Sequence, residues 1–209
     1  MSYPSPPKRF EPLFEPWPKG TEFWRCHPVR RGPLEANATT ASGRFRPVYD
    51  KGRNVVPTCY AADTEHAAIA EGPFHDLPIS STPKHLARAI SDARALTPLS
   101  ATRDLNLVTF RGHGLRRIGE TQASLIEPGP ACYEESAGWG QAAYDHPSHP
   151  DGVIWVSRQF PGGAAMLLFW DRCGGAIRQD GPTYLLATGR GFELLAEAAN
   201  AAGVLIVES

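Results

Sequence analysis

Val55-Val56-Pro57-Thr58-Cys59-Tyr60-Ala61-Ala62-Asp63-Thr64-Glu65-His66-Ala67-Ala68-Ile69-Ala70-Glu71 is the stretch that constrains the fold most closely. Its first half is rich in β-branched and aromatic residues, which predict a buried strand over residues 55–62. Asp63 can cap a helix, and the alanine-rich residues after it predict a short helix that Gly72-Pro73 ends. The stretch therefore predicts a strand–helix corner, with Tyr60 on the strand and Glu71 at the far end of the helix.

The remaining pattern predicts a single α+β domain with a central β-sheet. Apolar segments predict helices over 133–144 and 192–201, and strands over 22–27, 104–110, 151–157, 164–170 and 204–207. Residues 85–110 mix helix and strand signals. Residues 30–56 predict a long loop, which in a compact domain is more often functional than idle. Residues 1–20 carry six prolines and predict an irregular N-terminal arm, so the domain is expected to span residues 21–209.

Composition indicates a globular protein rather than one that binds nucleic acid or spans a membrane. The chain has 209 residues, a net charge of −1 and 42% hydrophobic residues, whereas a nucleic-acid-binding surface needs a basic face. No segment reaches the roughly 18 apolar residues of a membrane span, and the N-terminus lacks an apolar signal core. The four cysteines are scattered without a C-x-x-C pair, so no metal site is expected. These features predict a cytoplasmic protein with free thiols.

Glu71 and Tyr60 are the first candidates for chemistry. Glu71 is expected where the helix dipole disfavours a carboxylate, so folding alone gives little reason for it; the alternative is a solvated residue at a helix end. Tyr60 offers an aromatic face that would attract a cationic ring such as a pyridinium; the alternative is a core tyrosine whose hydroxyl bonds the backbone. With a fixed cation beside them, these two residues could hold a dinucleotide and break its ribosyl bond.

Two arginines and a serine complete the candidates. Arg44 lies in the long loop, and its guanidinium fork suits a pyrophosphate or a carboxylate; an ordinary surface ion pair is the alternative. Arg25 interrupts an apolar strand on the face that alternation gives to Phe23, and a charge there needs a partner. Ser157 ends its strand outside any G-x-S-x-G motif. It could hydrogen-bond a ribose or an amide, or simply terminate the strand.

The order of these segments resembles the RES-domain family, which is named for an arginine, a glutamate and a serine. The matching segments are Phe23-Trp24-Arg25, Gly43-Arg44-Phe45, Tyr60-Ala61-Ala62, Glu71 and Asp151-Gly152-Val153-Ile154-Trp155-Val156-Ser157. The resemblance covers most of the chain. The chain differs from compact members in its longer loop between Arg44 and Tyr60, in its proline-rich arm, and in the extra helix and strand after Gly189.

The resemblance implies a fold similar to ADP-ribosyltransferase toxins and an enzyme that consumes NAD. NAD would be the substrate, its nicotinamide–ribose bond would be cleaved by hydrolysis or phosphorolysis, and no metal would be required. Glu71, Arg44 and Tyr60 would be catalytic, with Glu71 stabilising the positive charge that develops on the ribose. Arg25 and Arg44 would clamp the phosphates. Tyr60 would face the nicotinamide, and Ser157 would hydrogen-bond on the nicotinamide side.

The same resemblance leaves other functions and partners open. Transfer of ADP-ribose to a protein would use the same residues with a different acceptor. A degenerate domain would only bind a nucleotide or a partner protein. Many family members are toxins that a helix-turn-helix type antitoxin neutralises, so such a partner is expected here, and a homo-oligomer is also left open.

Overall fold

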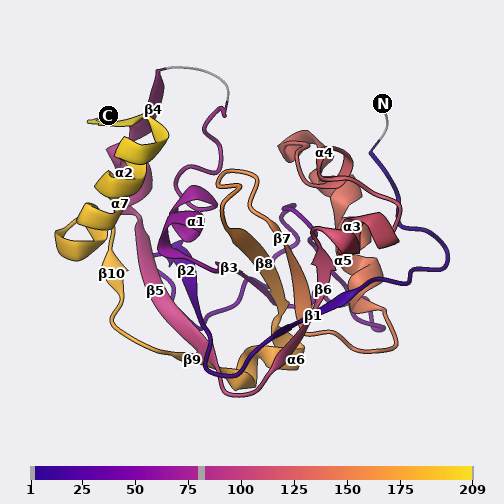
Figure 1. Ribbon diagram of the computed structural model, residues 1–209. Helices are drawn as coiled ribbons and strands as arrows, with labels where there is room; N and C mark the ends of the chain where they lie inside the picture. The colour runs from indigo at the N-terminus through magenta and orange to yellow at the C-terminus, as the bar shows by residue number, and fades with distance from the viewer. Residues whose placement is uncertain (1–2, 80–82, 209) are drawn as a thin grey trace.

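The computed structural model of the protein describes residues 3–79 and 83–208. Within these ranges nine strands form one curled sheet, shown in Figure 1, in the order β1, β6, β7, β8, β3, β2, β5, β10, with β9 also paired to β5. Neighbouring strands are antiparallel except β6 and β7, which are parallel. The strands are β1 (Phe14–Trp17), β2 (Glu22–Pro28), β3 (Thr58–Ala62), β5 (Arg94–Ala101), β6 (Leu105–Phe110), β7 (Gly152–Val156), β8 (Ala164–Phe169), β9 (Ile177–Gln179) and β10 (Tyr184–Leu185).

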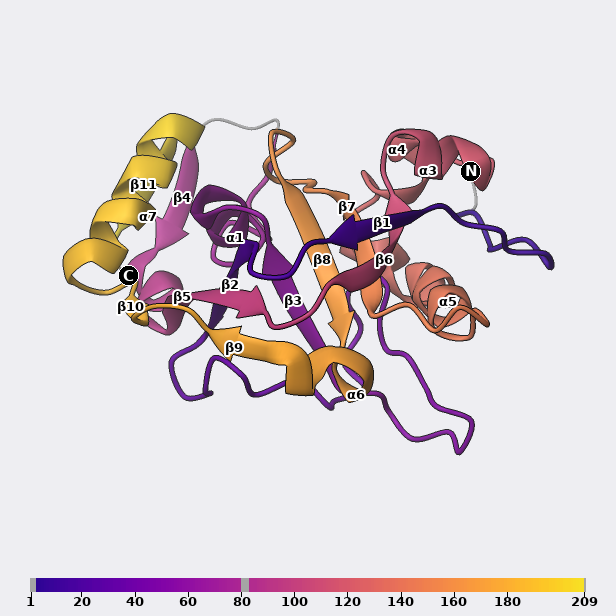
Figure 2. The same ribbon diagram turned by 60° about the horizontal axis from the view of Figure 1, so that its bottom comes forward.

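Two groups of helices lie towards opposite ends of the sheet, as Figure 1 and Figure 2 both show. One group holds α1 (Glu65–Ala70), α2 (Arg88–Asp92) and α7 (Gly189–Ala202), beside a small parallel sheet of β4 (Lys84–Ala87) and β11 (Val204–Val207). The other holds α3 (His113–Arg117), α4 (Gln122–Leu125), η1 (Pro130–Cys132) and α5 (Tyr133–Tyr144). After β8 the chain forms α6 (Trp170–Cys173) and η2 (Gly174–Ala176). No helix of the described residues has the length and apolar character to cross a membrane.

Each helix group builds its own hydrophobic core on the sheet. In the first core Trp139 of α5 packs with Phe110 and Trp155. In the second core Ile69 of α1 and Leu195 of α7 join a cluster that includes residues of β2, β3 and β5. A third core lies on the other side of the same strands, because side chains alternate between the two faces of a strand. The middle of the sheet therefore carries the boundary between the first two cores.

The predicted α+β fold with a central sheet is confirmed, and three local predictions are corrected. Residues 14–17, predicted as part of an irregular arm, form β1. Among the strands of the described residues β1 pairs only with β6, and a proline is tolerated on such an edge. The cap of α1 is Thr64 rather than Asp63, because the Thr64 side chain accepts from Ala67 N at 3.2 Å. Helix α7 starts at Gly189 rather than Phe192.

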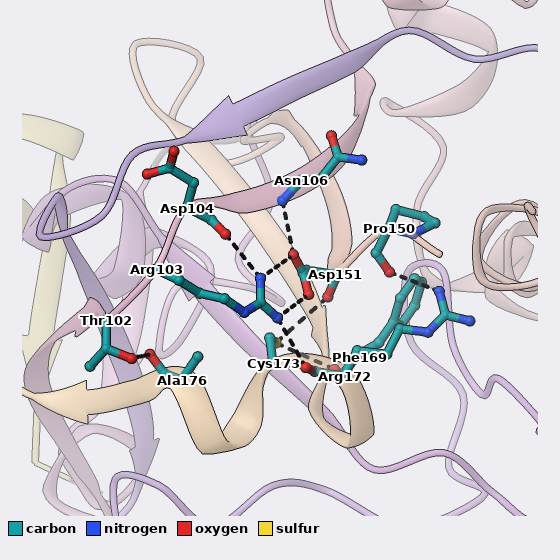
Figure 3. Close-up of polar contacts among 10 residues, drawn as sticks. All are labelled: Thr102, Arg103, Asp104, Asn106, Pro150, Asp151, Phe169, Arg172, Cys173 and Ala176. Carbon is teal, nitrogen blue, oxygen red and sulfur yellow. Dashed lines mark hydrogen bonds and ion pairs between the residues drawn. The ribbon is translucent and has the colours of Figure 1, made fainter. Parts of the chain in front are cut away.

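The Asp-Gly pair at the start of β7 has a structural explanation. Asp151 is buried and accepts from Arg103 Nη1 at 2.8 Å, from Arg103 Nη2 at 2.7 Å and from Asn106 N at 2.9 Å, as Figure 3 shows. A Cβ on Gly152 would lie 2.3 Å from Leu167 O, so only glycine fits there. These contacts fix the start of β7, and Ser157 directly follows its other end.

Candidate active site

A cavity of about 240 Å³ lies over the middle of the sheet, between the two helix groups. Its floor is a row of side chains that face one another across adjacent strands, from Trp155 through Ala165 and Ala62 to Trp24. The two alanines leave space at the centre of the row, and the two tryptophans bound it. Its walls come from the loop around Arg44, the end of α1 at Glu71 and the start of α5 at Tyr133.

Glu71 lines the cavity as the C-terminal cap of α1. Its Oε1 accepts from Ser157 Oγ at 2.6 Å, from Arg158 N at 2.9 Å and, more weakly, from Gln159 N at 3.5 Å. These donors offset the unfavourable helix dipole at this position. No described residue donates to Oε2, so one carboxylate oxygen stays available to a ligand.

Ser157 is fully buried and does not line the cavity. Its hydroxyl donates to Glu71 and accepts from Phe160 N at 3.0 Å. The structure thus brings Ser157 to the carboxylate of Glu71 rather than to the cavity surface.

Tyr60 lies on β3 with its ring in the cavity wall. The ring packs edge-on against Trp155, with 6.3 Å between the ring centroids. The hydroxyl donates to Arg44 O at 2.6 Å, and burial raises the pKa of this hydroxyl above its ordinary value. A Cβ on Gly43 would lie 2.6 Å from that hydroxyl, so glycine lets the loop approach Tyr60 closely. Tyr60 therefore combines a partly exposed aromatic face with a hydroxyl that anchors the Arg44 loop.

Arg44 is buried and lines the cavity. Its Nη2 donates to Pro128 O at 2.9 Å, its Nη1 reaches Leu125 O at 3.5 Å, and the guanidinium lies 5.3 Å from the centroid of the Tyr133 ring. The next residue, Phe45, is fully buried in the first core at a φ of 64°. This aromatic anchor holds the loop so that Arg44 reaches the cavity.

Arg25 lies on the other side of the sheet from the cavity. Its strand neighbours Trp24 and Cys26 line the cavity, and alternation turns Arg25 away from it. Arg25 donates to Pro33 O at 2.5 Å and to Glu35 O at 2.6 Å, so it ties a loop to β2. Alternation places Arg25 on the same face of β2 as Phe23, and that face is not the face of the cavity. The structure therefore does not bring Arg25 together with Arg44, Tyr60 and Glu71.

Two further arginines line the cavity and were not among the sequence candidates. Arg46 is buried, its Nη2 donates to Thr39 O at 2.5 Å, and its buried Nε has no partner among the described residues. Burial lowers the pKa of the Arg46 guanidinium. The Arg94 side chain, at the start of β5, has no described acceptor or ion-pair partner. The one signal for Arg46 in the sequence was its position two residues after Arg44 in the predicted loop. Nothing in the sequence singled out Arg94.

The remaining polar wall is formed by His75 and Tyr133. His75 Nε2 lies 2.7 Å from Tyr133 Oη, and Nδ1 lies 2.8 Å from Asp76 Oδ1. Cys26 also lines the cavity, but burial raises the pKa of its thiol to about 12, so it is a neutral wall residue. Among the residues that the structure describes, no group of three or more His, Cys, Asp or Glu side chains is arranged to hold a metal ion.

Comparisons with known proteins identify the family and the fold of this chain. The family model of the RES domain matches residues 22–188, whereas a search of the curated proteins finds no match. Among solved structures, a chain of the M. tuberculosis MbcT–MbcA toxin–antitoxin complex is similar in fold, with a TM-score of 0.61 and 18% sequence identity. The similarity covers 86% of this chain and 90% of that chain. Since the family model spans most of the sequence and includes every residue of the cavity wall, the chain belongs to the RES domain family.

Proposed function

We propose that this protein is a toxin that cleaves the bond between nicotinamide and ribose in NAD. The observation that carries the proposal is the carboxylate of Glu71, which is held through one oxygen and lines a cavity rich in arginine and aromatic side chains. Membership of the RES domain family supports the proposal, and so does the fold shared with a chain from a toxin–antitoxin complex.

The size of the cavity indicates which part of NAD enters it. A volume of about 240 Å³ is below the roughly 300–1,000 Å³ of sites that enclose a whole drug-sized ligand. The cavity therefore suits one end of a dinucleotide, the nicotinamide and its ribose. The pyrophosphate and adenosine would extend outwards past the arginines.

Glu71 is suited to stabilise the transition state of ribosyl transfer. As the bond from C1′ to the ring nitrogen breaks, its electron pair neutralises the pyridinium and positive charge develops on the ribose. A carboxylate oxygen beside that charge stabilises the transition state more than the ground state. Ser157 Oγ and Arg158 N hold the other oxygen, so the carboxylate needs little reorganisation during the reaction. We therefore assign Glu71 as the catalytic residue and Ser157 as the residue that positions it.

The other side chains of the cavity wall include aromatic rings and guanidinium groups. Tyr60 and Trp155 offer ring surfaces to the cationic nicotinamide ring. Arg44, Arg46 and Arg94 offer donors to the phosphates. Arg25 is left out of this assignment, because its guanidinium bonds loop carbonyls on the other side of the sheet.

A partner that blocks the cavity follows from the proposed activity. An enzyme that consumes NAD without control would harm the cell that makes it. The similar fold in the MbcT–MbcA complex occurs in a toxin bound to an antitoxin, and we propose a cognate antitoxin of the helix-turn-helix type here. With a net charge of −1, this chain would bind such a partner through shape and apolar contacts more than through long-range attraction.

The proposal is tested by measuring nicotinamide release from NAD by the purified full-length chain and by Glu71→Gln. The substitution keeps the volume of the side chain and its contact with Ser157, but it removes the charge. We expect release to fall by at least about a hundredfold, the scale of a lost electrostatic stabilisation. Glu65→Gln, on the same helix but outside the cavity, is the matched control and should keep wild-type turnover.

The outcomes separate the alternatives. Release of nicotinamide with transfer of label from NAD to a protein would favour ADP-ribosylation as the activity. Absence of release from the wild-type chain would contradict the proposed cleavage and favour a binding domain. Equal release from wild type and Glu71→Gln would contradict the assignment of Glu71 as the catalytic residue.

A further inference from the structure

One wall of the cavity holds a hydrogen-bonded chain of side chains that the assignments above do not use. His75 lies in the turn after α1 and Tyr133 at the start of α5, and both line the cavity. The imidazole bonds Tyr133 Oη through Nε2 at 2.7 Å and Asp76 Oδ1 through Nδ1 at 2.8 Å. Gln159 Nε2 donates to His75 O at 2.6 Å and fixes the backbone of this turn. The chain therefore runs from the cavity wall to the exposed carboxylate of Asp76.

The hydrogen-bond partners assign the tautomer of His75. A carboxylate only accepts hydrogen bonds, so Nδ1 carries the proton and donates to Asp76. In the neutral imidazole Nε2 is then an acceptor, and Tyr133 must donate its hydroxyl proton to it. The lone pairs of the Tyr133 oxygen remain able to accept a proton from a molecule in the cavity. This is the direction that a general base needs.

We propose that Tyr133, His75 and Asp76 form a proton relay that activates water as the acceptor of the ribosyl group. This inference rests on the NAD cleavage proposed above. The water oxygen bonds to C1′ while the bond from C1′ to the nicotinamide nitrogen breaks, and that electron pair stays on the nicotinamide. A water proton moves to Tyr133 Oη as the hydroxyl proton of Tyr133 moves to His75 Nε2. The resulting imidazolium is paired with Asp76 and releases its proton to solvent.

The charges around the relay fit this direction of transfer. Tyr133 is faced by Arg44, whose guanidinium lies over the ring, and by Glu71, Arg158 and Asp76. Burial raises the pKa of Tyr133, so the phenol stays protonated and passes a proton on rather than acting as a phenolate. The positive charge of Arg44 stabilises the partial negative charge that the Tyr133 oxygen carries during the transfer.

The relay distinguishes water from the other acceptors. Free water is a very weak acid at neutral pH, so it is a poor nucleophile unless a base takes its proton. Inorganic phosphate and a protein carboxylate already carry negative charge at neutral pH, so neither needs a base to attack C1′. A base built into the cavity wall is thus useful for hydrolysis and superfluous for phosphorolysis or for transfer to a carboxylate.

The test compares His75→Gln and Tyr133→Phe with wild type in nicotinamide release, with and without sodium azide. Glutamine can still accept the Tyr133 hydrogen bond but cannot take up a proton, and phenylalanine keeps the ring under Arg44. We expect each variant to lose about a hundredfold in turnover with water, the scale of general base catalysis. Azide, an anion that needs no base, should restore cleavage and form ADP-ribosyl azide, but it should not rescue Glu71→Gln.

Two controls keep the test decisive. His85→Gln makes the same change at an exposed residue of β4 outside the cavity, and it should behave as wild type. Asp76→Asn alters the far, exposed end of the relay and should fold even if His75→Gln does not; we expect a loss of about twofold to fivefold, the effect of an exposed ion pair.

Wild-type turnover in both relay variants, or a loss that azide does not restore, would overturn the relay while leaving the proposed NAD cleavage intact. Preferential formation of ADP-ribose 1-phosphate in inorganic phosphate, or labelling of a protein in a lysate, would overturn water as the acceptor. If the wild-type chain releases no nicotinamide at all, the proposed function fails and the relay fails with it.

Discussion

Replacing Ser157 with alanine separates a residue that positions Glu71 from one that binds the substrate. The substitution removes a hydroxyl that donates to Glu71 Oε1 at 2.6 Å and accepts from Phe160 N at 3.0 Å. A hydrogen bond to a charged group contributes about 1.5–3 kcal/mol and a neutral one about 0.5–1.5 kcal/mol, so the free energy of unfolding should fall by about 2–4 kcal/mol. For a chain of this size that lowers Tm by about 5–15 °C.

The effect on turnover follows from what remains at Glu71. Arg158 N still donates to Oε1 at 2.9 Å, but the carboxylate loses its shortest hydrogen bond and part of its orientation. If the lost energy of about 1.5–3 kcal/mol appears in the transition state, kcat falls roughly 10-fold to 150-fold. KM for NAD should change less than about twofold, because the hydroxyl does not line the cavity.

Steady-state nicotinamide release gives kcat and KM, and calorimetry gives Tm. Ser91→Ala is the matched control: Ser91 is also fully buried, and its hydroxyl donates to Arg88 O at 2.9 Å, away from the cavity. It should lower Tm without changing kcat. A raised KM for Ser157→Ala at unchanged kcat would refute the positioning role and return Ser157 to the substrate contact that the sequence suggested.

Two further predictions concern binding and pH. Removing the guanidinium in Arg94→Gln or Arg46→Gln should weaken NAD binding by about 1.5–3 kcal/mol, measured by calorimetry on a Glu71→Gln background. Arg25→Gln is the control and should leave the affinity for NAD unchanged. Equal affinity of all three variants would exclude the assignment of Arg46 and Arg94 to the phosphates. Burial lowers the pKa of His27, so the unfolded chain takes up this proton first as pH falls below about 6.5, and the folded state loses stability there. Thermal melts from about pH 5 to 8 should show this His27-dependent loss of stability at low pH in wild type and not in His27→Gln.

The sequence predicted the strand–helix corner well because local signals decide it. The strand pattern around Tyr60 and the alanine-rich helix that Gly72-Pro73 ends both appear in the structure, and Glu71 lies at the end of that helix as expected. Strand β1 was missed because Pro16 argues against a strand, and only the position of β1 at the sheet edge makes this proline tolerable. Whether a strand lies at the edge or in the centre of a sheet depends on how the whole sheet assembles, so a local sequence pattern does not predict it.

Arg25 shows the limit of alternation as a guide to a site. Alternation correctly groups Arg25 with Phe23, but the sequence gives no sign of which face of β2 carries the cavity. That choice depends on the row from Trp155 to Trp24, which joins strands far apart in the chain. Arg94 was missed for the same reason, because its strand reaches the cavity only through pairing with β2.

The charged groups at the cavity differ from those elsewhere in the kind of partner they have. Arg103 is paired with Asp151 and Arg111 with Glu15, so these charges largely neutralise one another. At the cavity, Arg44 and Arg46 donate to backbone carbonyls, and Glu71 accepts from a hydroxyl and from backbone N–H groups.

Neutral partners hold these side chains in place without cancelling their charge, so the field of each remains available to a ligand. A ligand that carries positive charge at one end and negative charge farther along offers a partner both to the carboxylate and to the arginines. NAD has that distribution of charge, a pyridinium ribose followed by a pyrophosphate. The choice of neutral partners is therefore itself a reason to assign Glu71 and the cavity arginines to binding and chemistry, and Asp151 and Arg103 to the fold.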